Sequence, residues 1–124
     1  MFKTSKDFGL LILRVGVSAL MLTHGYGKFL KLFTDPTDFG DPIGLGPIIS
    51  LILTVIGEFV APILIIIGYK TKLAAIPALI TMLVAAFVVH ASDPIGTKEK
   101  ALFYAIAFLA LAFTGAGKYS IDRK

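Results

Sequence analysis

Three ionisable side chains share one face of the first apolar segment of the sequence. If that segment is helical, Arg14, His24 and Lys28 fall within a sector of roughly 80°, because an α-helix turns about 100° per residue. A charge alone at the centre of a bilayer costs at least about 2.5–3.5 kcal/mol, so such groups point into the protein and pair. An imidazole titrates near neutrality and can exchange protons there. The spacing therefore predicts a polar pocket suited to ligand binding or proton relay.

The second apolar segment carries a matching polar stripe. Ser50, Thr54 and Glu58 recur every four residues, which places them on one helix face. Pro62 follows Glu58 by four residues and has no N–H to donate to the Glu58 carbonyl, so we expect a kink and a free acceptor beside the carboxylate. We expect Arg14 to be the ion-pair partner of Glu58.

His90 and Glu99 extend this polar set near the expected outer ends of the last two segments. Structural explanations exist for several members: Lys28 could reach the outer headgroups, and Glu99 fits the N-terminal dipole of a helix. The Arg14–Glu58 pair could equally fix the helix register, and His90 could be a solvated end residue. The sequence assigns no catalytic residue and no metal site. The candidate ligand-binding or proton-relay residues are Arg14, His24, Lys28, Glu58 and His90.

Composition indicates that lipid is the solvent of this chain. Of its 124 residues, 56% are hydrophobic and 16% are charged, whereas soluble domains average about 45–50% and about 25%. The net charge of +4 is scattered over short loops, so no nucleic-acid surface is predicted. There are no cysteines, which excludes disulfide exchange and thiolate metal sites within this chain. A single domain over residues 1–124 is expected.

Four apolar segments are long enough to approach the roughly 20 residues that cross a bilayer. They contain no alternation at period two, and an all-α integral membrane four-helix bundle with up-down topology is predicted. The first segment is too long for a signal peptide and is expected to remain as an anchor. The predicted helices cover residues 8–33, 46–68, 73–92 and 99–115.

Basic residues in the loops predict the orientation of the bundle. Seven of them fall on one side, which places both termini in the cytoplasm by the positive-inside rule. The other side carries three lysines and an Asp-rich loop, and is expected to face outward. The cytoplasmic set is Lys3, Lys6, Lys70, Lys72, Lys118, Arg123 and Lys124.

The order of these polar elements resembles the DoxX family over nearly the whole chain. The resemblance rests on Arg14, "HGYGK" at residues 24–28, Gly57–Glu58, "GYKTKLAA" at 68–75, His90 and the final "GAGKYSID". It implies a small four-helix protein of the prokaryotic cytoplasmic membrane. It also implies a link to thiosulfate:quinone oxidoreductases or to other membrane redox complexes.

Four functions follow as alternatives. The first is an accessory subunit of a membrane redox-associated complex, with other membrane or peripheral subunits as partners. The second is a quinone-binding subunit, in which His24 would donate to a quinone carbonyl and Glu58 would relay a proton. The third is a small-solute or proton transporter, which with four helices would need a homo-oligomer. Haem ligation by His24 and His90 is disfavoured, and no intrinsic cofactor is expected.

Overall fold

The described part of the protein is helical throughout its regular structure. The structure is a computed structural model that describes residues 2–35, 44–89 and 92–122, and these contain no strand. The elements α2, η1 and α3 follow one another without a break, as do α4 and η2, so the described residues form four helical rods. The all-α prediction is confirmed. The elements are α1 (Phe2–Thr34), α2 (Pro47–Val55), η1 (Ile56–Val60), α3 (Ala61–Ile67), α4 (Thr71–Val84), η2 (Ala85–Val89) and α5 (Ile95–Thr114).

Two helices begin at least one turn earlier in the chain than hydropathy predicts. The first begins at Phe2 instead of residue 8, and the last at Ile95 instead of residue 99, directly after Pro94. The added turns are polar, and a pattern of apolar residues does not mark polar helical turns. Within the described ranges, three helices are long and apolar enough to span a membrane by length and composition. These spans are Lys6–Thr34, Pro47–Ile67 and Thr71–Val89.

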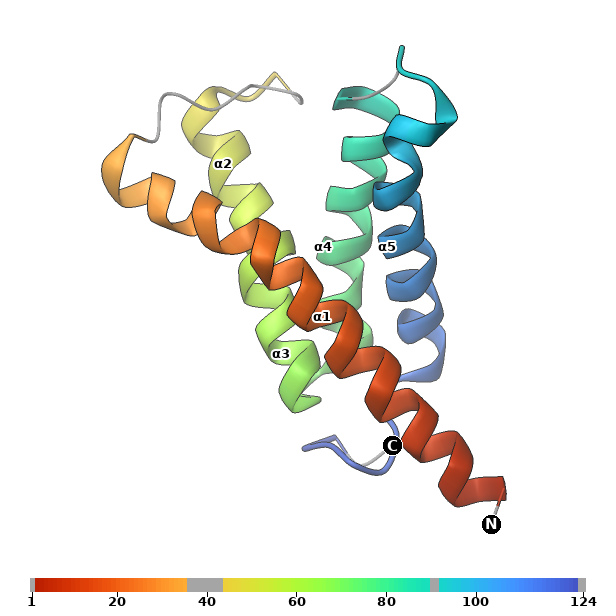
Figure 1. The fold of residues 1–124 in the computed structure, drawn as a ribbon. Coiled ribbons are helices and arrows are strands. Elements are labelled where there is room, and N and C mark those ends of the chain that lie inside the picture. The colour runs from red at the N-terminus through yellow and green to blue at the C-terminus, as the bar shows by residue number, and fades with distance from the viewer. Residues whose placement is uncertain (1, 36–43, 90–91, 123–124) are drawn as a thin grey trace.

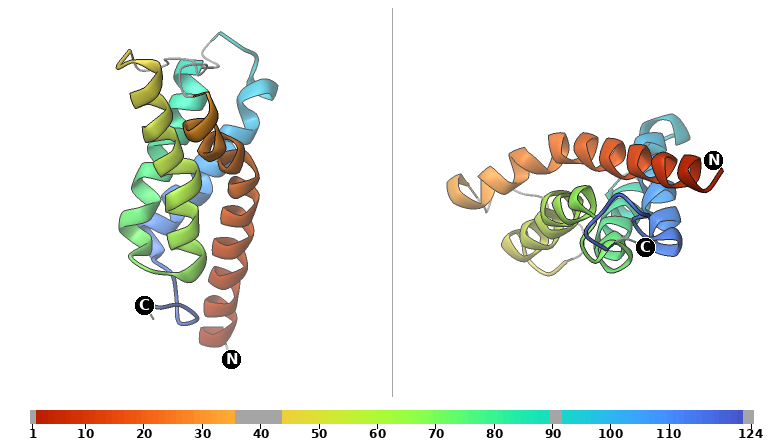
Figure 2. Two further views of the ribbon diagram at one scale, coloured as in Figure 1. Left: turned by 90° about the vertical axis from the view of Figure 1, so that its left-hand side faces the viewer. Right: turned by 90° about the horizontal axis from the view of Figure 1, so that it is seen from below.

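Helix α1 runs obliquely across one face of the bundle that α2–α3, α4 and α5 form (Figures 1 and 2). Helices α4 and α5 pack closely along their length, because alanines on α4 allow α5 to approach. Phe108 of α5 is fully buried in this contact. The buried core consists of Met21, Ala61, Ile65, Ala74, Ala75, Ala78, Met82, Ala105, Phe108 and Leu111.

A π-helical turn, η1, precedes Pro62 and carries Glu58. In it the amide of Ala61 donates to the carbonyl of Ile56, five residues back instead of four. The Glu58 carbonyl, which receives no N–H from Pro62, packs against Gly25 of α1. A Cβ atom at Gly25 would lie 2.0 Å from this oxygen and 2.5 Å from its carbon. The backbones of α1 and η1 therefore touch at the level of Glu58.

The opposite side of the π turn is packed just as closely against α4. A Cβ atom at Gly57 would lie 1.9 Å from Oγ1 of Thr81 and 2.8 Å from the carbonyl oxygen of Pro77. The Thr81 hydroxyl donates to that carbonyl at 2.7 Å. Two glycines thus let three rods meet around the turn that holds the buried carboxylate.

The last described residues fold back over the turn between α3 and α4. The amide of Asp122 donates to the carbonyl of Gly68 at 2.8 Å, and its carboxylate accepts from the amides of Lys70 and Thr71 at 2.8 Å each. The carboxylate thereby satisfies amides that the first turn of α4 leaves without helical partners. Gly68 has a φ of 74°, and a Cβ there would lie 2.2 Å from that of Ser120. This end of the bundle is consequently closed by the chain's own C-terminal segment.

We expect Gly25→Ala to destabilise the protein by about 2–3 kcal/mol, because the added methyl group meets backbone that has nowhere to move. Thermal unfolding of the purified protein in detergent measures the effect. Gly27→Ala is the matched control, since a Cβ there has open space, and it should change stability by less than about 1 kcal/mol. Equal stability of the two variants would contradict the close contact.

Candidate functional site

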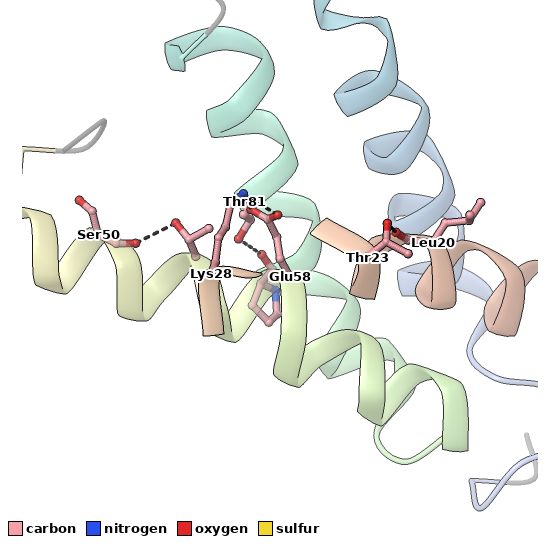
Figure 3. Close-up of polar contacts among 8 residues, drawn as sticks. Leu20, Thr23, Lys28, Ser50, Glu58 and Thr81 are labelled. Carbon is pink, nitrogen blue, oxygen red and sulfur yellow. Dashed lines mark hydrogen bonds and ion pairs between the residues drawn. The ribbon is translucent and has the colours of Figure 1, made fainter. Parts of the chain in front are cut away.

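An ion pair links α1 to the π turn in the interior of the bundle. Nζ of Lys28 lies 2.7 Å from Oε1 and 2.8 Å from Oε2 of Glu58, so the ammonium bridges both oxygens. The two side chains point toward one another in Figure 3. Only 5% of the Glu58 side chain is exposed, whereas 34% of the Lys28 side chain is. The carboxylate is thus confined, and the lysine reaches it from a more open position.

Two aromatic contacts involve residues near this pair. Phe29 and Phe59, each next in sequence to a member of the pair, stack with ring centroids 4.3 Å apart and an interplanar angle of 9°. His24 meets Tyr104 of α5 edge-on, with ring centroids 5.9 Å apart. The rings join α1 to both η1 and α5 at the level of the ion pair.

A pocket of about 260 Å³ opens beside the pair, between α1, η1, the α4–η2 rod and α5. Its polar wall holds two lysines, one carboxylate, one imidazole and one phenol, and methionines and alanines form the remainder. Among the described residues, no three His, Asp or Glu side chains come together to hold a metal ion. The lining residues are Met21, His24, Lys28, Glu58, Met82, Ala85, Lys100, Ala101 and Tyr104.

A larger groove of about 810 Å³ adjoins the pocket between α1 and α5. It is mainly apolar and is lined by exposed side chains such as Leu20 and Phe103. Three residues, His24, Lys100 and Tyr104, line both the pocket and the groove. A polar recess inside the bundle is therefore continuous with a surface suited to hydrocarbon.

The predicted Arg14–Glu58 ion pair is wrong. Arg14 is almost completely buried, but its guanidinium donates to the carbonyls of Ile65 (2.8 Å), Ile66 and Tyr119 (2.5 Å). The last carbonyls of a helix have no intrahelical donors and carry the negative end of its dipole, so the end of α3 is a favourable site for a cation. Arg14 joins α1, α3 and the C-terminal segment and lines neither pocket nor groove.

The remaining predicted residues divide into two groups. His24, Lys28 and Glu58 come together in the pocket, as the sequence predicted for a polar site. His90 lies outside the described residues. The hydroxyl of Thr54 donates to the Ser50 carbonyl at 2.8 Å, and neither residue lines the pocket.

Sequence reasoning missed two polar residues of the pocket, Lys100 and Tyr104. They are four residues apart and therefore on one face of α5. Both lie inside the predicted helix over residues 99–115, where Lys100 contributes to the outer-side charge and Tyr104 carries no predicted role. The i, i+4 spacing of a lysine and a tyrosine was the signal that could have found them.

Comparison with known proteins agrees with this architecture. A family model described as DoxX matches residues 9–91. The chain belongs to the DoxX family. It is 31% identical over 125 residues to the inner membrane protein YqjF of Escherichia coli K12, covering 98% of this chain and 95% of that protein. It is also 31% identical to the inner membrane protein YphA of the same organism, covering 95% of each chain. No solved structure matches.

The location of this DoxX protein follows from two findings together. Both Escherichia coli relatives are inner membrane proteins. Among the described residues, three helices are long and apolar enough to cross a bilayer. The protein is therefore a multi-pass protein of the prokaryotic inner membrane, and the lipid bilayer is its solvent.

The two members of the buried ion pair should respond unequally to substitution. Lys28→Met leaves a confined carboxylate without its cation and should destabilise the protein by about 3 kcal/mol. Glu58→Gln leaves a lysine that can turn toward the headgroups, and should cost only about 1 kcal/mol. Thermal unfolding in detergent distinguishes the two, and the double variant should be more stable than Lys28→Met alone. Additive losses in the double variant would contradict the pairing.

Proposed function

We propose that this DoxX protein binds a membrane-soluble compound with a polar head, and that a quinone is the first candidate. One observation carries the proposal: His24, Lys100 and Tyr104 line both the polar pocket and the apolar groove. A compound with a polar ring and a hydrocarbon tail could place its head among the polar groups and its tail along α1 and α5. Ligand sites generally combine such an apolar wall with a few converging polar groups.

The donor set of the pocket fits a quinone head. The ammonium of Lys100, the imidazole of His24 and the hydroxyl of Tyr104 can each donate a hydrogen bond to a carbonyl oxygen. Glu58, held by Lys28, can accept or release a proton at the same pocket. A bound quinone would supply two-electron, two-proton chemistry. The role of these residues would be to orient the head and to carry its protons.

Electrons for such chemistry would come from another protein. The chain has no cysteine, so it cannot supply a thiol-based redox couple of its own. This supports the role of a ligand-binding, accessory subunit in a larger membrane redox complex. The family resemblance to thiosulfate:quinone oxidoreductases points in the same direction.

Added quinone should protect the purified protein against thermal unfolding. At a concentration one hundred times Kd, decylubiquinone should raise the free energy of unfolding by about 2.7 kcal/mol. His24→Leu should reduce this protection, because it removes a polar group from the junction of pocket and groove. Tyr26→Leu is the control, since Tyr26 is exposed on the same helix and lines neither cavity. No protection of the wild-type protein would refute quinone binding.

We also propose that both termini face the cytoplasm. The charge bias of the loops supports this, and the start of α1 lies beside the C-terminal segment, where the amide of Lys118 donates to Oδ1 of Asp7 at 3.3 Å. Figure 1 shows both ends of the chain at the same end of the bundle. Fusion of alkaline phosphatase to either terminus should be inactive, whereas fusion of green fluorescent protein should fluoresce. An active phosphatase at one terminus would overturn the orientation.

A further inference from the structure

We propose that the preferred ligand is a long-chain amphiphile whose head carries an ionised acid group, bound by Lys100 at the junction of pocket and groove. The inference rests on the proposed binding of a lipophile with a polar head, and it assigns that head an acid group in place of a quinone ring. It is based on the balance of charges in the pocket and on the position of Lys100, the pocket cation that does not belong to the Lys28–Glu58 ion pair.

The pocket contains more cationic than anionic groups. Its described lining holds two ammonium groups, Lys28 and Lys100, and one carboxylate, Glu58. Lys28 bridges both carboxylate oxygens at 2.7 and 2.8 Å, so the charge of Glu58 is already matched. Lys100 forms no ion pair with a carboxylate among the described residues. A ligand with one negative charge would bring the pocket to neutrality.

The position of Lys100 determines how such a ligand lies. Lys100 lines both cavities, together with His24 and Tyr104, so a head bound to its ammonium leaves a tail free to follow the groove. The groove walls are mainly apolar side chains of α1 and α5, and Glu99 is the one carboxylate in the described groove lining. A long-chain carboxylate would fit this arrangement, with its acid group at the lysine and its hydrocarbon tail against the apolar side chains of the groove. Charge-assisted hydrogen bonds of this kind are stronger than neutral ones.

The groove also provides a route from the bilayer. Helices α1 and α5 contact each other over a short stretch only, whereas α4 and α5 pack along their length. Leu20 and Phe103, which line the groove, are both largely exposed on the outer surface of the bundle. A compound dissolved in lipid could therefore enter sideways between α1 and α5, without passing through water.

A matched pair of ligands tests the inference. Palmitate and hexadecanol have the same tail and differ in the charge of the head. We expect palmitate to bind the full-length protein in nanodiscs about 10- to 100-fold more tightly than hexadecanol. Lys100→Gln should remove this preference, and Lys100→Arg should retain most of it. Retention by the arginine variant also shows that a substitution at this position is compatible with folding.

Two control substitutions distinguish direct contact with the ligand from general effects of changing charge or side-chain size. Lys98→Gln removes the same charge two residues away and outside both cavities, so it should leave the preference for palmitate unchanged. Leu20→Trp should fill the groove and weaken both ligands, whereas Ile80→Trp, exposed on α4, should weaken neither.

The possible outcomes distinguish the two proposals. If palmitate and hexadecanol bind equally, or if Lys98→Gln and Lys100→Gln have the same effect, the acid-head inference is wrong and the lipophile pocket stands. If palmitate, hexadecanol and decylubiquinone all fail to bind, the proposed function fails as well.

Discussion

The contact between Gly25 and the Glu58 carbonyl determines how the first helix lies on the second rod. Because two backbones touch there, α1 has a single register on α2–α3 at that level. Lys28, one turn beyond Gly25, is then brought to the Glu58 carboxylate. The two rods run antiparallel, so Arg14, eleven residues before Gly25, lies opposite the end of α3 instead of opposite Glu58. Its guanidinium bonds to Ile65 and Ile66 accordingly.

The π turn makes this contact possible. Pro62 cannot donate to the Glu58 carbonyl, and the local widening of the helix turns that part of the backbone toward α1. Glycines on both sides, Gly25 and Gly57, leave room for it. A regular α-helix with larger residues at these positions would hold the rods apart. The carboxylate would then lie farther from the lysine that neutralises it.

The sequence alone predicted the helical class, the membrane environment and three of the pocket residues. Those predictions depend on composition and on which face of one helix a residue occupies, both of which are local properties. The partner of Glu58 depends on the register between two helices, and one contact of small residues sets that register. Arg14 is eleven residues from Gly25, which lies opposite Glu58. At a rise of about 1.5 Å per residue, Arg14 is therefore about 16 Å from Glu58 along the helix axis. Lys100 and Tyr104 lie inside the predicted last helix, but the face of that helix that meets α1 also depends on packing between helices, which the sequence does not specify.

The two cations Arg14 and Lys28 of α1 therefore have different roles, although they share a helix face in the sequence. Arg14 donates to backbone carbonyls at the closed end of the bundle, where the C-terminal segment covers it. Lys28 is one-third exposed and neutralises a carboxylate that lines a cavity. Because Lys28 already matches Glu58, the remaining cation of the pocket, Lys100, is left to interact with whatever enters from the groove. The same arrangement that stabilises the buried carboxylate thus leaves the pocket with a preference for negative charge.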